Sequence, residues 1–531
     1  MKILNTQQIK LVDFNTIVNL NINSVDLMEK AAGKCLQWIE DQEHIDELNT
    51  IHIFCGMGNN GGDGLALGRM LNLEFYDAQV YIVHFSDKMS DDFITNYNRA
   101  EEFQIHPISI HSEDDFPEIK ETDFIIDAIF GTGINKAPSG FTKKLIKHIN
   151  QSKATTISLD IPSGLFADKS VLDRESVVKS TITLTFQMPK LAFLLPDNGE
   201  FVSNFELLDI GLDQEYIKSL ETPYHFITRD DVFSFYKKRN KFSHKGSYGH
   251  ALIIGGSFGK MGSVTLAAKA ALKIGSGLVT AYIPKCGYHI LQTSASEVMV
   301  EVDAENEIEY INFKSEASVI GLGIGIGTSD LTSEAVCEFL KTNKLPIVID
   351  ADALNIISKN LEVLDFLSEN CILTPHPKEL ERLIGKWQND YEKLELLKTF
   401  SLNYPFVIVV KGAHTMVIQN GIFYFNSTGS SALAKAGTGD VLTGMITGLL
   451  AQHYSPLQAA IMGVFLHGLS ADVFTTINSP ETFLASDILN FLPGAFNAFL
   501  SPYDPKMDDD EDENNEDDPN FLDDDDDDSP F

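Results

Sequence analysis

The nine residues GMGNNGGDG, Gly56–Gly64, combine closely spaced glycines with two asparagines and an aspartate. They follow a short apolar run, 50–54, and precede the apolar letters LAL, so we expect them to join a strand to a helix. The spacing of Gly56, Gly58 and Gly61 is that of a dinucleotide-binding turn, in which backbone N–H groups at a helix start bind a pyrophosphate. By itself this spacing is a weak indication of a redox dinucleotide.

The polar residues of the same loop favour a different ligand. Asp63 would place a carboxylate against the pyrophosphate, and two negative groups at that distance repel each other. Asn59 and Asn60 offer carbonyl acceptors as well as amide donors, which suits a hydroxyl-rich or amide ligand, or a monovalent cation. The second expected strand ends in YIVHF and runs into Ser86, without the acidic residue that a dinucleotide domain places there.

A second glycine-rich turn, AGTGD at 436–440, opens the apolar stretch 441–450, which we predict to be a helix. Successive backbone N–H groups at such a helix start form an anion hole for a transferring phosphoryl group. Asp440, in the first turn, is placed to take the proton from an acceptor hydroxyl. The structural alternative is a glycine-rich turn whose aspartate only caps the helix.

Alternating strand-like and helix-like stretches must position the first loop. Residues 24–42 have the apolar period of an amphipathic helix. The short β-branched runs between helical stretches predict a parallel, doubly wound sheet, an N-terminal Rossmann-like three-layer α/β/α fold. Three loops, GMGNNGGDG, FGTG (130–133) and DIPSG (160–164), would then converge at the carboxyl ends of its strands. The predicted strands are 50–54, 78–85, 123–129, 155–160 and 181–186.

A polar stretch, 212–225, separates this region from a second α/β unit that contains the AGTGD turn. We predict domains at 1–222 and 223–503, each with its own ligand crevice, followed by a tail at 504–531. The predicted strands of the second domain are 250–254, 278–283, 317–321, 345–350, 370–374 and 406–410.

Charge and composition restrict the partners. The 531 residues are 44% hydrophobic, with a formal net charge of −36. Residues 508–531 hold 15 acidic side chains and no basic one, so removing those 15 charges leaves −21 for the rest. Such a charge repels phosphate and argues against nucleic acid and anionic membranes as partners. The acidic residues 504–531 cannot bury a core, so we expect a disordered, solubilising tail. An interaction tail or cation buffer is the alternative.

Five scattered cysteines form no CxxC pair, which favours a reducing compartment. The N-terminal letters MKILNTQQIKLVDF contain no uninterrupted apolar core, so we expect no signal peptide. No run of about 18 apolar residues is apparent. We therefore expect a soluble, cytoplasmic protein.

Four motifs in the first half, GMGNNGGDGLALGRML, DAIFGTG, LDIPSGL and FQMPKLAFLLP, together resemble the N-terminal domain of the NAD(P)H-hydrate repair proteins. The resemblance spans most of residues 1–212 and implies an NAD(P)HX epimerase. It implies a K⁺ ion held by Asn60, Asp127 and Ser163, oxygen ligands that suit a hard cation. Asp160 is our candidate acid/base, with a turn-capping aspartate as the alternative. The implied substrate contacts are Asn59, Asn60, Gly61, Gly62, Asp63, Gly131, Thr132, Gly133, Ile134, Asn135, Lys136, Ala137 and Asp160.

The AGTGD turn resembles the signature loop of the ribokinase superfamily, which implies a ribokinase-like second domain. The ordered motifs HKGSYGHALIIGG, GLGIGIGT, IDADALN, LTPHPKELERL and VIVVKGAHTMV narrow the resemblance to the ADP-dependent NAD(P)H-hydrate dehydratases, over most of residues 226–475. That family implies ADP as co-substrate, with Mg²⁺ on its phosphates. The implied ADP contacts are Lys411, Gly412, Ala413, His414, Thr415 and Gly439. The implied contacts to the hydrated nucleotide are Ser263, Gly325, His376 and Asp440, of which Asp440 is the catalytic base.

Two of these residues have simpler interpretations. His376 lies between two prolines and could only pack, and Lys411 could be a solvated loop lysine. The sequence also departs from the family pattern at Ser263, where alanine is more usual, and in the isoleucines of GLGIGIGT.

The motifs together predict a bifunctional repair enzyme, an isomerase and lyase acting on NADHX and NADPHX, and a homo-oligomer. One alternative is a ribokinase-like vitamin-precursor or sugar kinase with a regulatory first domain, which would release a stable phosphorylated product. Another makes the first domain a non-catalytic nucleotide-binding or scaffold module.

Overall fold

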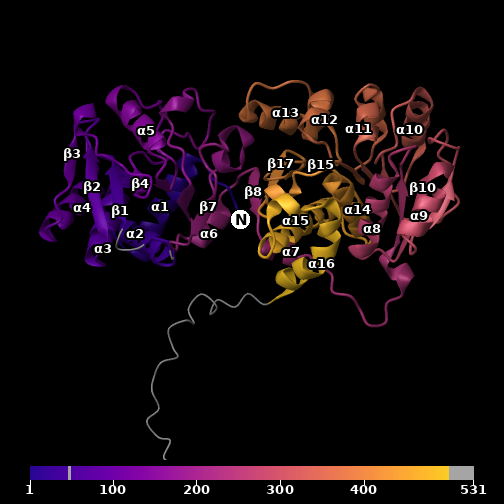
Figure 1. Ribbon diagram of the computed structural model, residues 1–531, viewed down its shortest axis with the longest axis horizontal. Helices are drawn as coiled ribbons and strands as arrows, with labels where there is room; N and C mark the ends of the chain where they lie inside the picture. Colours follow the sequence, from indigo (N-terminus) through magenta and orange to yellow (C-terminus); the bar gives the residue numbers. More distant parts are fainter. Residues whose placement is uncertain (43, 46–48, 502–531) are drawn as a thin grey trace, which may run out of the picture.

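The structure is a computed structural model that describes residues 1–42, 44–45 and 49–501. The predicted tail, 504–531, lies outside the described residues. Figure 1 shows two α/β bodies side by side, each built around its own sheet. The chain passes from the first sheet to the second between β7 (Phe205–Leu208) and β8 (Tyr224–Ile227).

The first sheet is parallel throughout, in the order β3-β2-β1-β4-β5-β6-β7. This is a doubly wound sheet whose strand order reverses between β1 and β4. All five predicted strands are present. The sequence reasoning missed β3 and β7, which are only three and four residues long and largely accessible to solvent. The strands before β7 are β1 (Thr50–Cys55), β2 (Asp77–Val83), β3 (Ile108–Ile110), β4 (Phe124–Ala128), β5 (Thr155–Leu159) and β6 (Ile182–Phe186).

Helices cover both faces of this sheet, because successive strand residues point to opposite sides. Ile53 packs with the helices of one face, α2, α3 and α4, whereas Phe54 packs with α5 on the other. The predicted helix 24–42 is observed as α2, and α1 was not predicted. The helices are α1 (Thr6–Leu20), α2 (Ser24–Glu40), α3 (Asn59–Leu73), α4 (Asp91–Glu102), α5 (Gly140–Ser152) and α6 (Gln214–Ser219).

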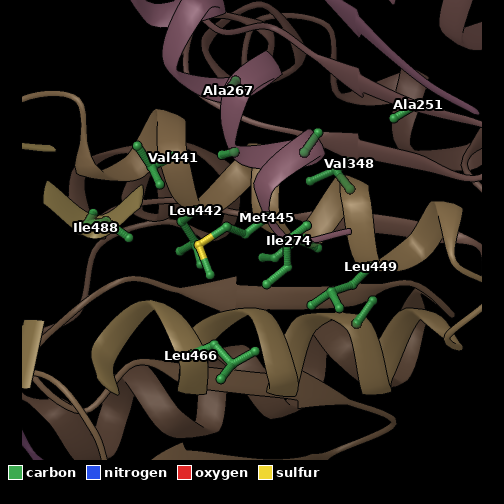
Figure 2. Packing of buried hydrophobic residues seen from close by; sticks show 14 of the residues in the cluster. Ala251, Ala267, Ile274, Val348, Val441, Leu442, Met445, Leu449, Leu466 and Ile488 are labelled. Atoms are coloured by element: carbon green, nitrogen blue, oxygen red, sulfur yellow. The ribbon is translucent and has the colours of Figure 1, made fainter. Parts of the chain in front are cut away.

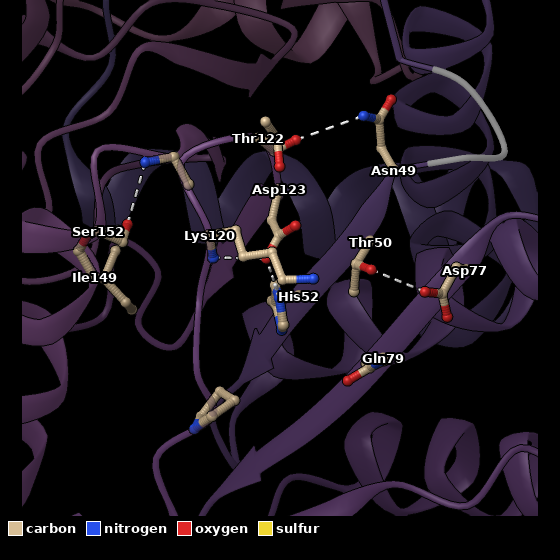
Figure 3. A network of polar contacts seen from close by, with 12 residues as sticks. Asn49, Thr50, His52, Asp77, Gln79, Lys120, Thr122, Asp123, Ile149 and Ser152 are labelled. Atoms are coloured by element: carbon tan, nitrogen blue, oxygen red, sulfur yellow. Dashed lines mark hydrogen bonds and ion pairs between the residues drawn. The ribbon is translucent and has the colours of Figure 1, made fainter.

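A polar cluster lies near the amino ends of β1 and β4, away from the glycine-rich loops (Figure 3). His52 is 3% exposed, and its ring nitrogens lie 3.2 Å from Asp123 Oδ2 and 3.3 Å from Tyr81 Oη. The same Asp123 oxygen accepts a hydrogen bond from the Lys120 N–H at 2.7 Å. Each buried group therefore has a partner within the protein, and we assign the cluster a structural role.

The second sheet follows the order β11-β10-β9-β12-β13-β14-β15-β16-β17-β8. It is parallel from β11 to β15, and β16 then pairs antiparallel with both neighbours. All six predicted strands are present, within about two residues at each end. Its remaining strands are β9 (His250–Ile254), β10 (Leu278–Ile283), β11 (Met299–Val302), β12 (Val319–Leu322), β13 (Ile347–Ile349), β14 (Cys371–Leu373), β15 (Val407–Val410), β16 (Met416–Gln419) and β17 (Ile422–Asn426).

Helix α14 lies at the centre of the second core, with Met445 and Leu449 among the apolar side chains of its neighbours (Figure 2). It approaches α8 so closely that a Cβ on Gly444 would lie 2.1 Å from the Ala267 carbonyl oxygen. The helices of this domain are α7 (Arg229–Phe233), α8 (Met261–Lys273), α9 (Tyr288–Ser294), α10 (Asp330–Thr342), α11 (Asp352–Ile357), α12 (Pro377–Ile384), α13 (Asp390–Asn403), α14 (Thr438–Ala451), α15 (Pro456–Thr475) and α16 (Ala485–Leu500).

Helix α15 corrects one expectation from the sequence. Its 20 residues are long and apolar enough to cross a membrane, although we had expected no such stretch. Of its most apolar window, 72% is buried inside the protein, and it packs against α14 and α16. Its apolar character is therefore that of a core helix.

The two domains share a packed interface. The β7 ring of Phe205 lies 6.1 Å from that of Phe226 in β8, between ring centroids. Asp197 and Asp390 cap each other: each carboxylate accepts the other residue's backbone N–H at 2.7 Å. At the N-terminus, Ile3 donates a backbone hydrogen bond to the Tyr224 carbonyl, which ties the start of the chain to the second sheet.

Two candidate active sites

The first site is a cavity of about 890 Å³ at the carboxyl ends of β1, β4 and β5. The loops after these strands line it, and α1 and the segment after β6 close it on another side. It therefore lies where strand order reverses, the usual ligand position in a doubly wound sheet.

Two glycines of the opening loop are required by close backbone approach. A Cβ on Gly56 would lie 1.9 Å from the Ile129 carbonyl oxygen, and one on Gly61 would lie 1.7 Å from the Gly56 carbonyl oxygen. No side chain fits at either position, so these glycines bring the start of α3 against the loop that follows β4. The spacing of Gly56 and Gly61, which resembles that of a dinucleotide-binding turn, is therefore required by backbone packing as well as by access for a ligand.

The structure brings most of the predicted epimerase contacts together. Gly61 and Gly62 do not line the cavity; a Cβ on Gly62 would lie 2.8 Å from Met28 Sδ, so this glycine lets α3 pack on α2. The predicted residues that line the cavity are Asn59, Asn60, Asp63, Gly131, Thr132, Gly133, Ile134, Asn135, Lys136, Ala137 and Asp160.

Three carboxyl groups meet one lysine in this cavity. Asp160 forms an ion pair with Lys190, whose side chain is 2% exposed and also donates to Thr185 Oγ1 at 2.6 Å. Burial raises the pKa of Asp63 well above its ordinary value, and the negative charges of Asp160 and Asp13 raise it further. Burial, reinforced by Asp160, raises the pKa of Asp13 to about 6, against the opposing effect of Lys190. One lysine cannot neutralise three carboxylates, and burial together with the neighbouring charges favours the protonated form of Asp63.

Asp160 has a strained backbone. Its φ of 63° lies in the left-handed region that non-glycine residues rarely adopt. Its N–H donates to the Leu184 carbonyl at 2.7 Å, which ties the turn after β5 to β6. Strain of this kind persists only where surrounding contacts hold it, and it is frequent at functional sites.

The predicted cation ligands lie beside the cavity. Asp127 is fully buried, and its carboxylate accepts hydrogen bonds from Ser158 Oγ at 2.9 Å and the Ser163 N–H at 2.8 Å. Burial raises the pKa of Asp127 despite these donors, and no ion pair joins it to a basic side chain in the described part of the chain. Asn60 is 7% exposed, and its amide nitrogen has no hydrogen-bond partner.

The second site is a cavity of about 1320 Å³ at the start of α14. All six predicted nucleotide contacts line it: Lys411, Gly412, Ala413, His414, Thr415 and Gly439. The Lys411 ammonium donates to Asp350 Oδ1 at 2.7 Å, and Thr443 Oγ1 donates to Asp350 Oδ2 at 2.6 Å. Asp350 is 1% exposed, so this lysine is fixed by a buried carboxylate and is not a freely solvated side chain.

The start of α14 has the arrangement expected of an anion hole. The N–H groups of its first turn have no acceptor within the helix, and Gly437 before it adopts a φ of 90°. His467 lies beside this turn with Nε2 3.0 Å from the Thr438 carbonyl, and burial lowers its pKa to about 4, so it is neutral near pH 7. The local positive charge thus comes from Lys411 and the helix dipole.

Of the predicted dehydratase contacts, Ser263 and Gly325 lie close to Asp440, and none of the four lines the cavity of about 1320 Å³. Burial raises the pKa of Asp440 to about 6; a hydrogen bond from Ser263 opposes this shift, and the charge of Asp350 adds to it. Ser263 also neighbours Gly325, since a Cβ on that glycine would lie 3.3 Å from the Ser263 Cβ. Asp440 is therefore ionised near pH 7 and close enough to neutrality to accept a proton.

His376 has a structural task. Its Nδ1 accepts from the Lys378 N–H at 3.1 Å, and its Nε2 lies 3.2 Å from Glu379 Oε1, so the ring caps α12. The backbone N–H of Lys411 donates to the Pro375 carbonyl at 3.0 Å, which sets this histidine beside the nucleotide loop. Both ring nitrogens are therefore engaged within the protein.

Within the described residues, no group of three or more His, Cys, Asp or Glu side chains is arranged to hold a metal ion.

The sequence reasoning missed four polar residues. Lys190 and Asp350 stand within quoted motifs, FQMPKLAFLLP and IDADALN, but were given no role. Asp13 lies in the N-terminal segment, which was examined only for a signal peptide. Thr443 is a helix residue with no distinctive local pattern.

Two α/β domains, one with a carboxyl-rich crevice and one with an anion-binding helix start beside a fixed lysine, define a two-domain nucleotide-handling enzyme. Family models match both halves: NAD(P)H-hydrate dehydratase over residues 251–493 and the YjeF-related protein N-terminus over residues 24–192.

Two curated relatives extend over nearly the whole chain. The bifunctional NAD(P)H-hydrate repair enzyme of Moorella thermoacetica is 34% identical over 491 residues, covering 89% of this chain and 92% of that protein. The bifunctional NAD(P)H-hydrate repair enzyme of Coxiella burnetii is 31% identical over 484 residues, covering 90% of this chain and 95% of that protein. The chain therefore belongs to the family of bifunctional NAD(P)H-hydrate repair enzymes, and the resemblance found in its motifs is confirmed.

Among solved structures, the ADP/ATP-dependent NAD(P)H-hydrate dehydratase of Bacillus subtilis, co-crystallised with ATP and Mg²⁺, is 30% identical. The alignment of the two structures covers 52% of this chain and 98% of the Bacillus subtilis chain, with a TM-score of 0.44.

Proposed function

We propose that the first domain epimerises the R and S forms of hydrated NADH and NADPH, and that the second converts the S form to NAD(P)H at the expense of ADP. The observation that carries this proposal is the presence of two different proton-handling sites in one chain. One holds a buried carboxyl, Asp63, whose pKa is raised, together with Asp160, which is paired with a lysine; the other holds a single carboxylate at an anion-binding helix start. Family membership favours repair over the vitamin-precursor kinase alternative.

In the first site, Asp63 and Asp160 are the acid and the base. Epimerisation at the hydrated carbon, whether by ring opening and closing or by proton transfer, needs one group that gives a proton and one that takes it. A carboxyl whose pKa is raised, beside one that is paired with a lysine, meets that need. Lys190 holds Asp160 in place, and Asp13 adds a third carboxyl group, whose pKa burial raises to about 6. The loop from Gly131 to Ala137 forms the wall of the cavity that contacts the nucleotide.

The residues Asn60, Asp127 and Ser163 fit a potassium ion. A fully buried carboxylate without a basic partner is costly unless a cation compensates it. The unsatisfied amide of Asn60 supplies an oxygen once its O and N positions are exchanged, an assignment that depends on the hydrogen-bond network. When bound, K⁺ would neutralise Asp127 and fix the amide of Asn60 toward the substrate.

In the second site, Asp440 accepts the proton of the 6-hydroxyl as that oxygen attacks the β-phosphate of ADP. A new O–P bond forms, the bond between the phosphates breaks, and AMP leaves. Loss of inorganic phosphate from C6 and of a proton from C5 then restores the ring double bond. The N–H groups at the start of α14 and the Lys411 ammonium stabilise charge on the transferred group. Mg²⁺ bound to the nucleotide phosphates would neutralise further charge there.

All five cysteines are free, in keeping with our proposal of a cytoplasmic location. The predicted domain boundaries and homo-oligomeric state stay predictions.

The test is recovery of reduced-nicotinamide absorbance from mixed R and S hydrates. With ADP, the whole mixture should recover; without it, nothing should. Recovery of nothing with either ADP or ATP would contradict the dehydratase. Recovery of only the S fraction, in a buffer where spontaneous epimerisation is slow, would contradict the epimerase. A stable phosphorylated product would favour the kinase alternative.

A further inference from the structure

The nucleotide cavity of the second domain is completed by the first domain. Residues 203–207, which are the first three residues of the edge strand β7 and the two before it, line the same cavity as the loop from Lys411 to Thr415 and Gly439. The adjoining apolar side chains of Phe193 and Val202 line it as well. The second domain alone therefore does not enclose this site.

This shared wall is held firmly against the nucleotide loop. The Phe205 ring lies 6.0 Å from His414 and 5.5 Å from Phe193, between centroids. His414 Nδ1 lies 3.1 Å from the Asn426 carbonyl, which fixes the ring within the loop. Phe205 also packs against the apolar cluster that contains Phe226, so the two domains meet as parts of one core. The geometry of the cavity thus depends on both domains together.

Polar groups on this wall lack partners in the protein. The side chains of Asn204 and Glu206 make no hydrogen bond or ion pair with any other described residue, and burial alone raises the pKa of Glu206. Across the cavity, the hydroxyl of Ser430 is buried and has no hydrogen-bond partner. Asn204 and Glu206 are exposed, so a ligand can reach them, and the Ser430 hydroxyl is the group here that lacks a hydrogen bond; all three line one cavity and offer hydrogen-bonding groups to a ligand.

Charge decides which part of a nucleotide these groups can face. The Lys411 ammonium and the first turn of α14 form the positive end of the cavity, where phosphates bind. A carboxylate such as Glu206 repels phosphate but accepts hydrogen bonds from amino or hydroxyl groups. The aromatic side chains of Phe193 and Phe205 supply apolar surface of the kind that a base contacts.

We propose that β7 of the first domain is the nucleoside-binding wall of the ADP site, with Glu206 and Asn204 as acceptor and amide partners of the adenosine half. This inference rests on the proposed function, because it assumes that the second cavity binds ADP. It makes nucleotide affinity in the dehydratase a property of both domains.

Calorimetric titration of the full chain with ADP and with pyrophosphate tests the proposal. Glu206→Ala and Asn204→Ala should each weaken ADP binding about five- to tenfold, the usual effect of losing one ligand hydrogen bond. Pyrophosphate, which lacks the nucleoside, should bind each variant as it binds the unaltered protein. The matched control is Glu215→Ala on α6, whose side chain is 85% exposed and lies outside the cavity. In the absorbance-recovery assay, the KM for ADP should rise, whereas kcat and the rate of epimerisation should stay unchanged.

Unchanged ADP affinity in both variants would overturn the inference while leaving the proposed function intact. Tighter pyrophosphate binding by Glu206→Ala would also overturn it, because Glu206 would then face the phosphates. Absence of ADP binding in the unaltered protein would instead contradict the proposed function.

Discussion

The two crevices of this protein use the same structural device for different chemistry. Each lies at the carboxyl ends of parallel strands, and in each a glycine-rich turn leads into a helix, α3 in the first domain and α14 in the second. At the start of α3, Asp63 and two asparagines line the crevice, and Lys190 pairs with Asp160, one of three carboxyl groups there. At the start of α14 the first-turn N–H groups are open, and Lys411, itself paired with the buried Asp350, lies beside them.

The difference shows that side chains around a helix start decide what it binds. An open turn with a cation next to it attracts phosphate, whereas a turn filled with carboxyl and amide groups is suited to proton transfer. Glycine spacing reports backbone approach in both cases and says little about reaction type.

The largest effect should come from removing the base of the second crevice. Asp440→Asn keeps the side-chain shape but cannot accept the hydroxyl proton, so ADP-dependent dehydration of the S hydrate should fall about 10²- to 10⁴-fold. Interconversion of the R and S hydrates, followed by chromatography, should be unchanged. A dehydration rate within twofold of the unaltered protein would remove Asp440 from the mechanism.

In the first crevice, Lys190→Met should impair epimerisation about 10- to 100-fold near neutral pH. Without the ammonium, no cation holds the Asp160 carboxylate in place or compensates its charge. An unchanged melting temperature and an unchanged rate of ADP-dependent dehydration of the S hydrate would separate this positioning role from simple loss of structure. Lys190→Arg, which keeps the charge, should restore much of the rate; an epimerisation rate of Lys190→Met within twofold of the unaltered protein would contradict the role.

The acidic side of the dehydration profile follows from Asp440. Because burial raises its pKa to about 6, the active carboxylate form predominates above that pH and is lost below it. At pH 5 about a tenth of the groups remain ionised, so the rate at saturating ADP should be about tenfold lower than at pH 7. A rate that stays level down to pH 5 would contradict Asp440 as the base.

The smallest effects concern the packing that places the two helix starts. Gly444→Ala forces a methyl group against the Ala267 carbonyl and should cost about 1–3 kcal/mol of unfolding free energy, seen as a lower melting temperature of the second domain. Gly33→Ala is the control: it lies within α2 with no atom within 4 Å of its added Cβ, and should stabilise by about 0.5–1 kcal/mol. Equal effects of the two changes would contradict the close approach of α14 to α8.

Local signals made much of this architecture predictable. The buried strands and the glycine-rich turns are each encoded within ten or so neighbouring residues, so the sequence located the loops around Asn60 and Asp440. Asp13 could not be foreseen, since α1 reaches the first cavity only through tertiary packing. Asp350 and Lys411 are 61 residues apart and meet because β13 and β15 end at the same edge of the sheet. The contribution of β7 to the second cavity depends on domain packing, which no short motif encodes.

The central claim is that one chain holds two separate catalytic sites that act in succession. Its most direct test uses mixed R and S hydrates with ADP, the variants Asp160→Asn and Asp440→Asn, and an equal mixture of the two. Asp160→Asn should recover only the S fraction, Asp440→Asn should recover nothing, and the mixture should recover the whole. Full recovery by Asp160→Asn alone, in a buffer that keeps spontaneous epimerisation slow, or failure of the mixture, would contradict two separate sites.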